Sequence, residues 1–325
     1  MRCWLLRVGF ILFCLLAFPE RSPAPLIYTP GEGWRYESVG GGGWQKTRAK
    51  DQMEVAQSAF DKNNLSLAFK AARRVVNVWP FSDYAPQAQY LLARCYEAEH
   101  DDEKAFKAYQ KLLVQYPKAD NCDEILKRQF VIANRYLAGQ WFRIAWGYIP
   151  FFPSMDKTIK LYEQIIKNGA YSEVGPQSQM NIGVANEKKL ISDYPAAAAA
   201  YERAADRYHD QKLGVDALYR EGLAFNKQAK TAEYDQSIAA QAIATFTDFM
   251  TLHAEDTRVP EARKLIESLK TEQARGSFDI AKYYEHHHRW EAAKIYYNDV
   301  LSKDPNSKYA ESARRRFDAI IKRGH

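Results

Sequence analysis

Three consecutive histidines, His286, His287 and His288, are the residues of this sequence with the most evident capacity for chemistry. Imidazole nitrogens are common metal ligands. Neighbouring residues on a helix diverge by about 100°, however, so three in a row cannot converge on one ion unless the helix unwinds. They also fall where a turn between two helices is expected. We therefore predict solvated turn histidines and no metal site.

Motifs for catalysis or cofactor binding do not stand out elsewhere. The sequence contains no HExxH, GxSxG or Walker motif. The glycine run from Gly40 to Gly43 is not followed by the lysine and helix that would cradle a phosphate. No set of nucleophile, base and orienting group can be recognised. We expect a protein that is not an enzyme and holds no cofactor.

An aromatic insertion at residues 139–155 is the most unusual stretch of the chain. Its aromatic residues are Trp141, Phe142, Trp146, Tyr148, Phe151 and Phe152. So many rings in so short a stretch are not expected to stay in water, and three interpretations are open. The insertion folds back as a self-packed plug, it offers a docking surface to a partner or an extended client, or it dips into a membrane interface, where Trp and Tyr are favoured.

Helices must position these residues, and a repeated pattern predicts them. Ala281 and Ala293 stand twelve residues apart, Tyr284 follows the first by three, and Tyr297 follows the second by four. Pro305 closes the unit, because proline cannot continue a helix. Small residues let two antiparallel helices approach closely, while aromatic residues fill the groove beside them. This is the helix–turn–helix pattern of tetratricopeptide repeats.

The pattern recurs along the chain and predicts six helical hairpins. The paired small positions are Ala56 with Ala68, Ala93 with Ala105, Ala133 with Thr158, Gly183 with Ala197, Gly222 with Ala242, and Ala281 with Ala293. The third and fifth hairpins carry insertions. A final helix over residues 309–322 has no partner after it and is expected to cap the array with a polar outer face. The sequence therefore predicts an all-α, right-handed superhelical solenoid of tetratricopeptide repeats over residues 47–325.

Joints between hairpins look alike at three places along the chain. Each has a serine, Ser82, Ser172 or Ser307, just before the next helix. The first N–H groups of a helix need an acceptor, and a serine side chain commonly supplies one. We therefore expect these serines to cap the coming helices.

Composition and charge exclude some classes of function. Apolar residues make up 46% of the 325 residues, which is enough for a large buried core. The net charge of +6 is too dilute over this length to indicate nucleic-acid binding. Cys95 and Cys122 are too few for a disulfide framework, and we expect both thiols to be free.

The start of the chain is predicted to be a signal peptide over residues 1–24. Arg2 and Arg7 precede an apolar run from Val8 to Phe18, which is too short to span a bilayer. Cys14 is a candidate for lipidation, although Phe13 stands where the lipidation signal has a small residue. Residues 25–46 are rich in proline and glycine, so an extended or flexible tether is expected there.

The exported leader, the repeated hairpins and the joint from Pro305 to Ala313 resemble the outer membrane protein assembly factor BamD (ComL) family. The resemblance covers about residues 47–322. It implies a periplasmic repeat lipoprotein at the inner face of the outer membrane, where it contacts the membrane peripherally. The implied partners are a barrel insertase, other subunits of the assembly complex and unfolded segments of outer-membrane proteins. The alternative is a periplasmic repeat scaffold for envelope or cell-division coordination or for secretin assembly.

Overall fold

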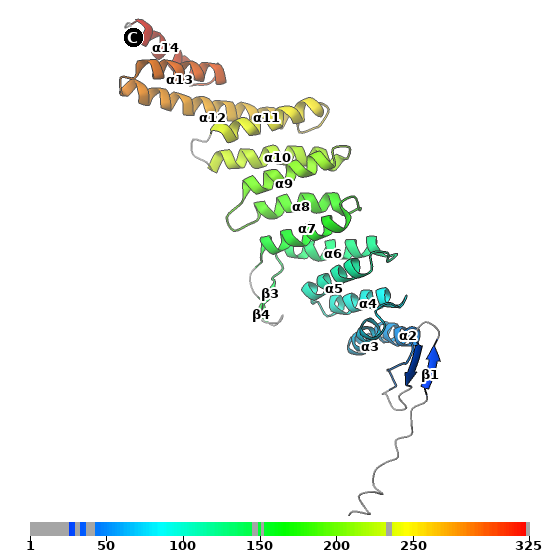
Figure 1. Cartoon of the computed structure of the whole chain (residues 1–325). Helices are drawn as coiled ribbons and strands as arrows, with labels where there is room; N and C mark the ends of the chain where they lie inside the picture. The colour runs from blue at the N-terminus through cyan, green and yellow to red at the C-terminus, as the bar shows by residue number, and fades with distance from the viewer. Residues whose placement is uncertain are drawn as a thin grey trace, which may run out of the picture. The chain divides into compact units, whose positions relative to one another are not determined.

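The computed structural model describes residues 26–29, 33–36, 43–144, 149–150, 153–231 and 236–322. Over this part of the chain, antiparallel helical hairpins follow one another in sequence order (Figure 1). The chain divides into two compact units, Met1–Ala119 and Asp120–His325. Each unit has its own helices and its own buried clusters.

The first unit holds two helical hairpins. Helix α2 (Ala49–Asp61) pairs with α3 (Leu65–Val78), and α4 (Ala85–Ala98) pairs with α5 (Asp102–Gln115). Met53, Val75 and Leu91 bring α2, α3 and α4 together in one buried cluster. Apolar residues three or four apart on each helix form the faces that meet there.

The second unit holds four hairpins and a last single helix. Their bounds are α6 (Cys122–Leu137), α7 (Met155–Gly169), α8 (Gly175–Glu187), α9 (Tyr194–Arg207), α10 (Lys212–Thr231), α11 (Gln236–Leu252), α12 (Val259–His286), α13 (Trp290–Lys303) and α14 (Ala310–Lys322). Helix α12 has 28 residues and serves two clusters. Its residue Ile266 packs with the fifth hairpin, while Ala281 packs with the sixth. The six hairpins and the capping helix predicted from sequence are therefore confirmed.

The paired small positions lie in the core, which confirms the predicted register. Ala56, Ala68, Ala93, Ala105, Ala133, Thr158, Ala197, Ala242, Ala281 and Ala293 are all fully buried. At Gly183 the helices approach closely, because a Cβ there would lie 2.3 Å from a ring carbon of Tyr201. A hydrogen in place of a side chain is what lets α8 and α9 meet at this point.

Two short β-hairpins depart from the all-α prediction. Strands β1 (Leu26–Thr29) and β2 (Gly33–Tyr36) pair antiparallel in the segment expected to be a tether. Strands β3 (Arg143–Ile144) and β4 (Ile149–Pro150) pair within the aromatic insertion. Both sets of strands contain apolar, β-branched or aromatic residues, which favour strands. Helical periodicity could not have revealed them, because each strand is only two or four residues long.

The end of the expected tether is fixed to the first helix by one buried side chain. Gln52 of α2 is fully buried and donates through Nε2 to the carbonyl oxygen of Trp44 at 3.1 Å. Its Oε1 accepts from the backbone N–H of Lys46 at 2.8 Å. Trp44 packs beside the cluster of α2, α3 and α4. Residues 44–46 are therefore part of the packed first unit.

Joints between hairpins share one backbone geometry. In five of them, two consecutive turns link residues three apart: Trp79, Ser82 and Ala85; Gly169, Ser172 and Gly175; Tyr208, Gln211 and Gly214; His253, Asp256 and Val259; and Asp304, Ser307 and Ala310. The N–H of the second residue donates to the carbonyl of the first, and the third donates to the second, at 2.9–3.2 Å. The repeated sequence pattern identified the three joints that contain serine. The other two joints have Gln211 and Asp256 at the position of the serine.

The capping role predicted for these serines is wrong. The hydroxyl of Ser82 donates to the carbonyl of Trp79 at 2.9 Å, and that of Ser172 donates to Gly169 at 2.7 Å. Ser307 does the same with Asp304. Each serine therefore closes the preceding helix. Helices α4 and α8 begin without a side-chain cap and have proline in the first turn, where a missing N–H costs nothing.

Turns within four of the hairpins use a residue in the left-handed conformation. Asn63, His100 and His288 have φ between 54° and 58°, and Gly139 has φ of 108°. Such a residue ends a helix while satisfying its last carbonyls. His286 is the last residue of α12, and His287 and His288 form the turn, with Nδ1 of His287 2.9 Å from the carbonyl oxygen of Tyr283. The histidine tract is thus the end of a helix and its turn.

A tyrosine–glutamate hydrogen bond recurs in three hairpins. Tyr109 donates to Glu97 at 2.7 Å, Tyr201 to Glu187 at 3.4 Å, and Tyr297 to Glu285 at 2.5 Å. Each partner lies four residues after the small residue of its helix. At these positions the first hairpin has Phe60 and Ala72, and the fifth has Asn226 and Phe246. The third hairpin has Leu137 and Tyr162 at these positions, so it keeps the tyrosine without the glutamate.

Glu221 of α10 is a buried carboxyl group whose environment is acidic. Only 8% of the residue is exposed. Burial, together with repulsion from Glu202, Asp206 and Asp248, raises its pKa to about 7. The hydroxyl of Thr245 on α11 donates to its Oε1 at 3.4 Å, which opposes this rise. The side chain therefore changes charge near neutral pH.

Replacing Glu221 by glutamine should stabilise the protein at pH 8 and have little effect near pH 4.5. In the folded state the pKa of Glu221 lies above its unfolded value of about 4.5, so the folded state binds more protons between these values. Stability due to this group is therefore lost as pH rises through that interval. Glutamine keeps an acceptor for Thr245 without the charge. We expect a rise in melting temperature of about 2–4 °C at pH 8; an equal shift at both pH values would contradict the assignment.

Cys95 and Cys122 are free, as expected. Burial raises the pKa of the Cys95 thiol to about 11, so it stays protonated. Among the helices that the structure describes, none is long and apolar enough to cross a membrane.

Candidate functional site

A buried polar network supports the helices from which the aromatic insertion emerges. The hydroxyl of Tyr162 on α7 donates to Oδ1 of Asn134 on α6 at 2.5 Å. Nδ2 of Asn181 on α8 lies 3.0 Å from the same oxygen and 3.1 Å from the tyrosine hydroxyl. Burial raises the pKa of Tyr162 well above its usual range, so the hydroxyl remains a donor. Three helices of two hairpins are thereby fixed in one arrangement.

Phe142 anchors the beginning of the insertion. Its side chain is 3% exposed and stacks on Tyr136 of α6, with ring centroids 4.0 Å apart and planes at 12°. The ammonium group of Lys157 lies 5.0 Å from the Phe142 centroid, in the range of a cation–π contact. Lys157 is held near the start of α7, where its N–H donates to the capping hydroxyl of Ser154 at 3.3 Å. One ring therefore ties the insertion to both helices of the third hairpin.

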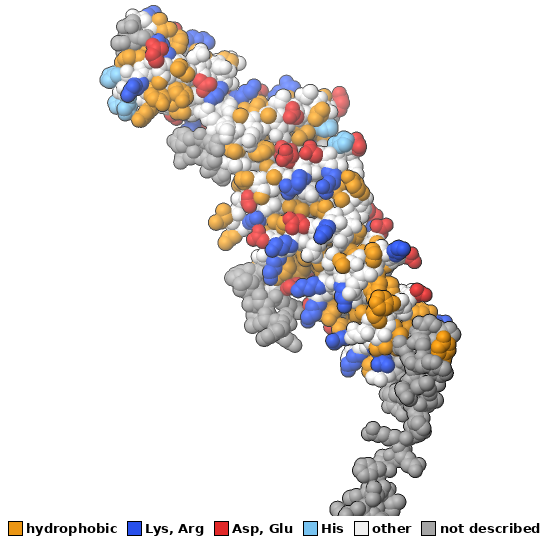
Figure 2. Space-filling view, in the orientation of Figure 1, with side chains coloured by type: hydrophobic (Ala, Val, Ile, Leu, Met, Phe, Trp, Pro, Cys, Tyr) orange, Lys and Arg blue, Asp and Glu red, His pale blue; other side chains and the backbone are white. Residues whose placement is uncertain are grey.

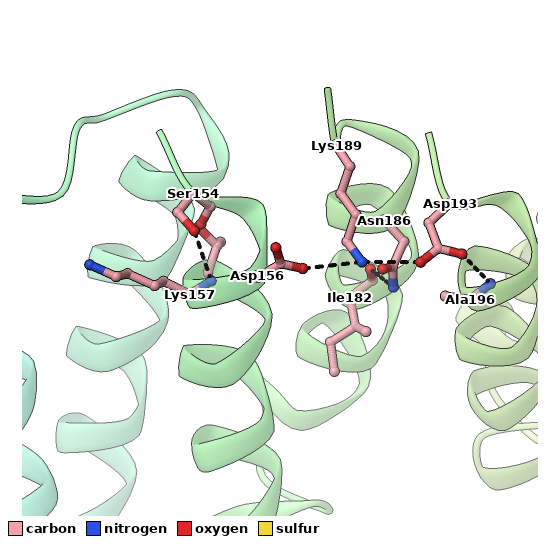
Figure 3. A network of polar contacts seen from close by, with 9 residues as sticks. Ser154, Asp156, Lys157, Ile182, Asn186, Lys189, Asp193 and Ala196 are labelled. Carbon is pink, nitrogen blue, oxygen red and sulfur yellow. Dashed lines mark hydrogen bonds and ion pairs between the residues drawn. The ribbon is translucent and has the colours of Figure 1, made fainter. Parts of the chain in front are cut away.

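Two lysines of the α8–α9 turn contact the end of α6 and the start of α7, between which the insertion lies. Nζ of Lys188 donates to the carbonyl oxygen of Leu137 at the end of α6, at 3.3 Å. Nζ of Lys189 lies 3.2 Å from Oδ1 of Asp156 in the first turn of α7 and 3.1 Å from Oδ2 of Asp193 (Figure 3). The third and fourth hairpins are thus joined at the end where the insertion begins.

Asp193 also fixes the shape of the α8–α9 turn. Its Oδ1 accepts from the N–H of Ala196 at 3.2 Å and caps α9 (Figure 3). Its own N–H donates to the carbonyl of Asn186 at 3.0 Å. The Asn186 side chain donates to the carbonyl of Ile182 at 3.0 Å. The turn that follows the two lysines is therefore held by hydrogen bonds at both of its ends.

Between these fixed ends, two apolar side chains point into solvent. Leu190 is 104% exposed relative to a reference residue, and Ile191 is 86% exposed. Trp141, next to the buried Phe142, is 54% exposed. Residues Trp141, Leu190 and Ile191 are here named the docking edge. Figure 2 shows apolar and charged side chains interleaved over the face of the molecule that is in view.

The docking edge includes residues that sequence reasoning found and residues that it missed. Trp141 and Phe142 were both proposed as binding residues, and the structure separates them into one exposed and one buried ring. Trp146, Tyr148, Phe151 and Phe152 of the insertion lie outside the described residues, as does Cys14. Leu190 and Ile191 were missed, although two adjacent apolar residues after two lysines in a turn are an unusual sequence signal.

The arrangement is suited to binding. Among the described residues, no group of three or more His, Cys, Asp or Glu side chains is placed to hold a metal ion. The lysines beside the docking edge are engaged in ion pairs or hydrogen bonds. Aromatic side chains such as that of Trp141 are typical anchors of protein interfaces.

Comparison with known families decides the relationship of the chain. The sequence pattern of YfiO, outer membrane lipoprotein, matches residues 45–127 and 155–323. The chain belongs to the YfiO family. This confirms the resemblance to the BamD family inferred from the hairpins and joints. The matched YfiO segments leave out residues 128–154, which hold nearly all of the aromatic insertion.

Solved structures to which the chain shows some similarity include a tetratricopeptide repeat protein from Parabacteroides merdae, with 13% identity and a TM-score of 0.32, covering 84% of this chain and 98% of that one. MamA from Desulfovibrio magneticus has 12% identity and a TM-score of 0.32, over 65% and 98% of the two chains. Pseudomonas aeruginosa PilF has 12% identity and a TM-score of 0.28, over 82% and 97%. At such scores, the tetratricopeptide assignment rests on the helix pairs of this chain. No curated protein matches the sequence.

Proposed function

We propose that this protein is a non-catalytic periplasmic scaffold at the inner face of the outer membrane, where it assists assembly of outer-membrane β-barrel proteins. Membership of the YfiO family of outer membrane lipoproteins is the observation that carries the proposal. The partners would be a barrel insertase, other subunits of its complex and unfolded segments of outer-membrane proteins. The scaffold would bind these segments and present them, without covalent chemistry.

The docking edge supports this role by its composition and rigidity. Leu190 and Ile191 expose most of their apolar surface, yet the turn that carries them is fixed by Lys189, Asp156 and Asp193. A preorganised apolar anchor loses little conformational entropy when a partner covers it. We infer that a partner subunit or client segment buries these side chains, together with Trp141.

This proposal is tested by placing a photo-crosslinking amino acid at Ile191 of the full chain. The protein is produced in its own host cells, so that crosslinks form in the cell envelope. We expect crosslinks to a subunit of the barrel-assembly complex or to an unfolded outer-membrane protein. Leu252, which is 69% exposed at the end of α11, provides a matched control position. Crosslinks from Ile191 only to cell-division or secretin-assembly proteins would overturn the assembly role and favour the alternative scaffold.

A pair of charge substitutions, Leu190→Asp with Ile191→Asp, should reduce co-purification with the barrel insertase at least about tenfold, which corresponds to roughly 1.4 kcal/mol of binding free energy. The melting temperature should stay unchanged, because both side chains are exposed. Leu252→Asp is the matched control and should leave co-purification unaltered. A double variant that co-purifies like the parent would remove the docking edge from the interface.

A further inference from the structure

A groove in the first unit is lined by other residues than the docking edge and has different chemistry. It has a volume of about 440 Å³ and is formed by α3, α4 and α5. Its floor includes Val76, Leu92 and Ala108, each less than 10% exposed. Phe69 and Tyr96 form an edge-to-face aromatic pair at its side, with centroids 5.1 Å apart. The groove thus has the size of a ligand site and an apolar floor.

The rim of the groove carries positive charge and no carboxylate. Arg73 of α3 and Lys104, Lys107 and Lys111 of α5 line it, and no Asp or Glu does. The lysines follow one face of α5 because they stand three and four residues apart. Lys104 is engaged with Asp101 at 2.7 Å and lies 5.8 Å from the Tyr96 ring. Arg73, Lys107 and Lys111 are exposed and form no ion pair with a described residue.

A buried amide at the floor completes the description. Gln89 of α4 is 2% exposed, and its Nε2 donates to the carbonyl oxygen of Ala108 at 3.0 Å. This bond fixes the amide orientation. Its Oε1 is buried and has no hydrogen-bond donor among the described residues. A buried acceptor without a donor is unfavourable, so a ligand that supplies a hydrogen-bond donor would gain from binding here.

We propose that this groove binds an extended acidic segment of a partner protein that also carries an aromatic or aliphatic side chain. The carboxylates pair with Arg73, Lys107 and Lys111, while the apolar side chain covers Val76 and Leu92. A backbone N–H of the segment donates to Gln89. A polypeptide segment can supply this donor together with carboxylate and apolar side chains on one chain, whereas a free phosphate has no apolar part. The inference does not depend on the proposed function, because it uses only residues of the first unit.

Fluorescence anisotropy with the full chain and a labelled peptide of alternating Glu and Phe, blocked at both ends, tests the proposal. We expect saturable binding that weakens as salt rises, because exposed charges are screened. The same peptide with Lys in place of Glu should bind at least about tenfold more weakly. Equal binding of both peptides would overturn the proposal. Binding to phosphatidylglycerol vesicles with no binding to the acidic peptide would overturn it as well.

Charge variants locate the binding in the groove. Lys107→Glu with Lys111→Glu should weaken peptide binding at least about tenfold. Lys50→Glu with Lys118→Glu makes the same charge change at exposed residues of the first unit outside the groove and should have an effect below about threefold. If the Glu variant fails to fold, Lys107→Gln with Lys111→Gln serves instead, with the same direction expected. Groove variants that fold and still bind the acidic peptide like the parent would contradict the proposal.

Discussion

Replacing Phe142 by alanine should lower the free energy of unfolding by about 3–5 kcal/mol, as expected for loss of a buried aromatic side chain. The ring stacks on Tyr136 and faces the ammonium of Lys157, so the change removes contacts to both helices of the third hairpin. Equilibrium unfolding in urea, followed by circular dichroism, measures the change.

The neighbouring variant Trp141→Ala is the matched control, because this ring is 54% exposed. We expect it to change the free energy of unfolding by about 1 kcal/mol or less, while weakening partner capture. Equal destabilisation by both variants would mean that the two rings share a buried environment, and the self-packed plug would then be the better interpretation of the insertion. Capture retained in Trp141→Ala would remove this residue from the docking edge.

Gly183→Ala should destabilise the fourth hairpin by about 1–3 kcal/mol, although it adds a single methyl group. The added Cβ would lie 2.3 Å from the ring of Tyr201, which is fully buried and cannot move aside freely. Thermal melts measure the loss. Gly43→Ala is a matched control, since a Cβ there would meet nothing within 4 Å.

A second substitution distinguishes this clash from a loss of helix flexibility. In the double variant Gly183→Ala with Tyr201→Leu, the added methyl no longer meets a ring. The double variant should therefore be destabilised by less than the sum of the two single variants, with a coupling energy of about 0.5–3 kcal/mol. Strict additivity would show that the contact between the two positions is not the cause.

The repeat architecture could be predicted from sequence because its signals are local and periodic. Ala93 with Ala105 and Ala281 with Ala293 state the same spacing at widely separated places, and burial confirms them. The insertions in the third and fifth hairpins displaced this spacing without hiding it, as Thr158 and Ala242 show. A pattern of small and aromatic residues thus survives changes of loop length.

Sequence reasoning failed where hydrogen bonds or tertiary contacts decide the outcome. From sequence alone, the hydroxyl of Ser82 could hydrogen-bond the end of the preceding helix or the start of the following one. Only the backbone geometry shows that it donates to the carbonyl of Trp79. The turn that carries the exposed Ile191 is joined to α7 by the ion pair between Lys189 and Asp156, which are 33 positions apart in the chain. Similarly, Trp141 and Phe142 are adjacent and alike in chemistry, yet stacking on Tyr136 buries only one of them.

The joints between hairpins and the turns within them divide the chain into segments of fixed and of variable length. Joints keep two consecutive backbone turns over seven residues, from Trp79 to Ala85 as from Asp304 to Ala310. The turns within hairpins range from three residues between α2 and α3 to the long insertion after Leu137. New sequence can therefore be accepted at one end of each hairpin without shifting its neighbours. A chain built in this way can acquire new partners by lengthening a turn, while the stacking of its hairpins is inherited unchanged.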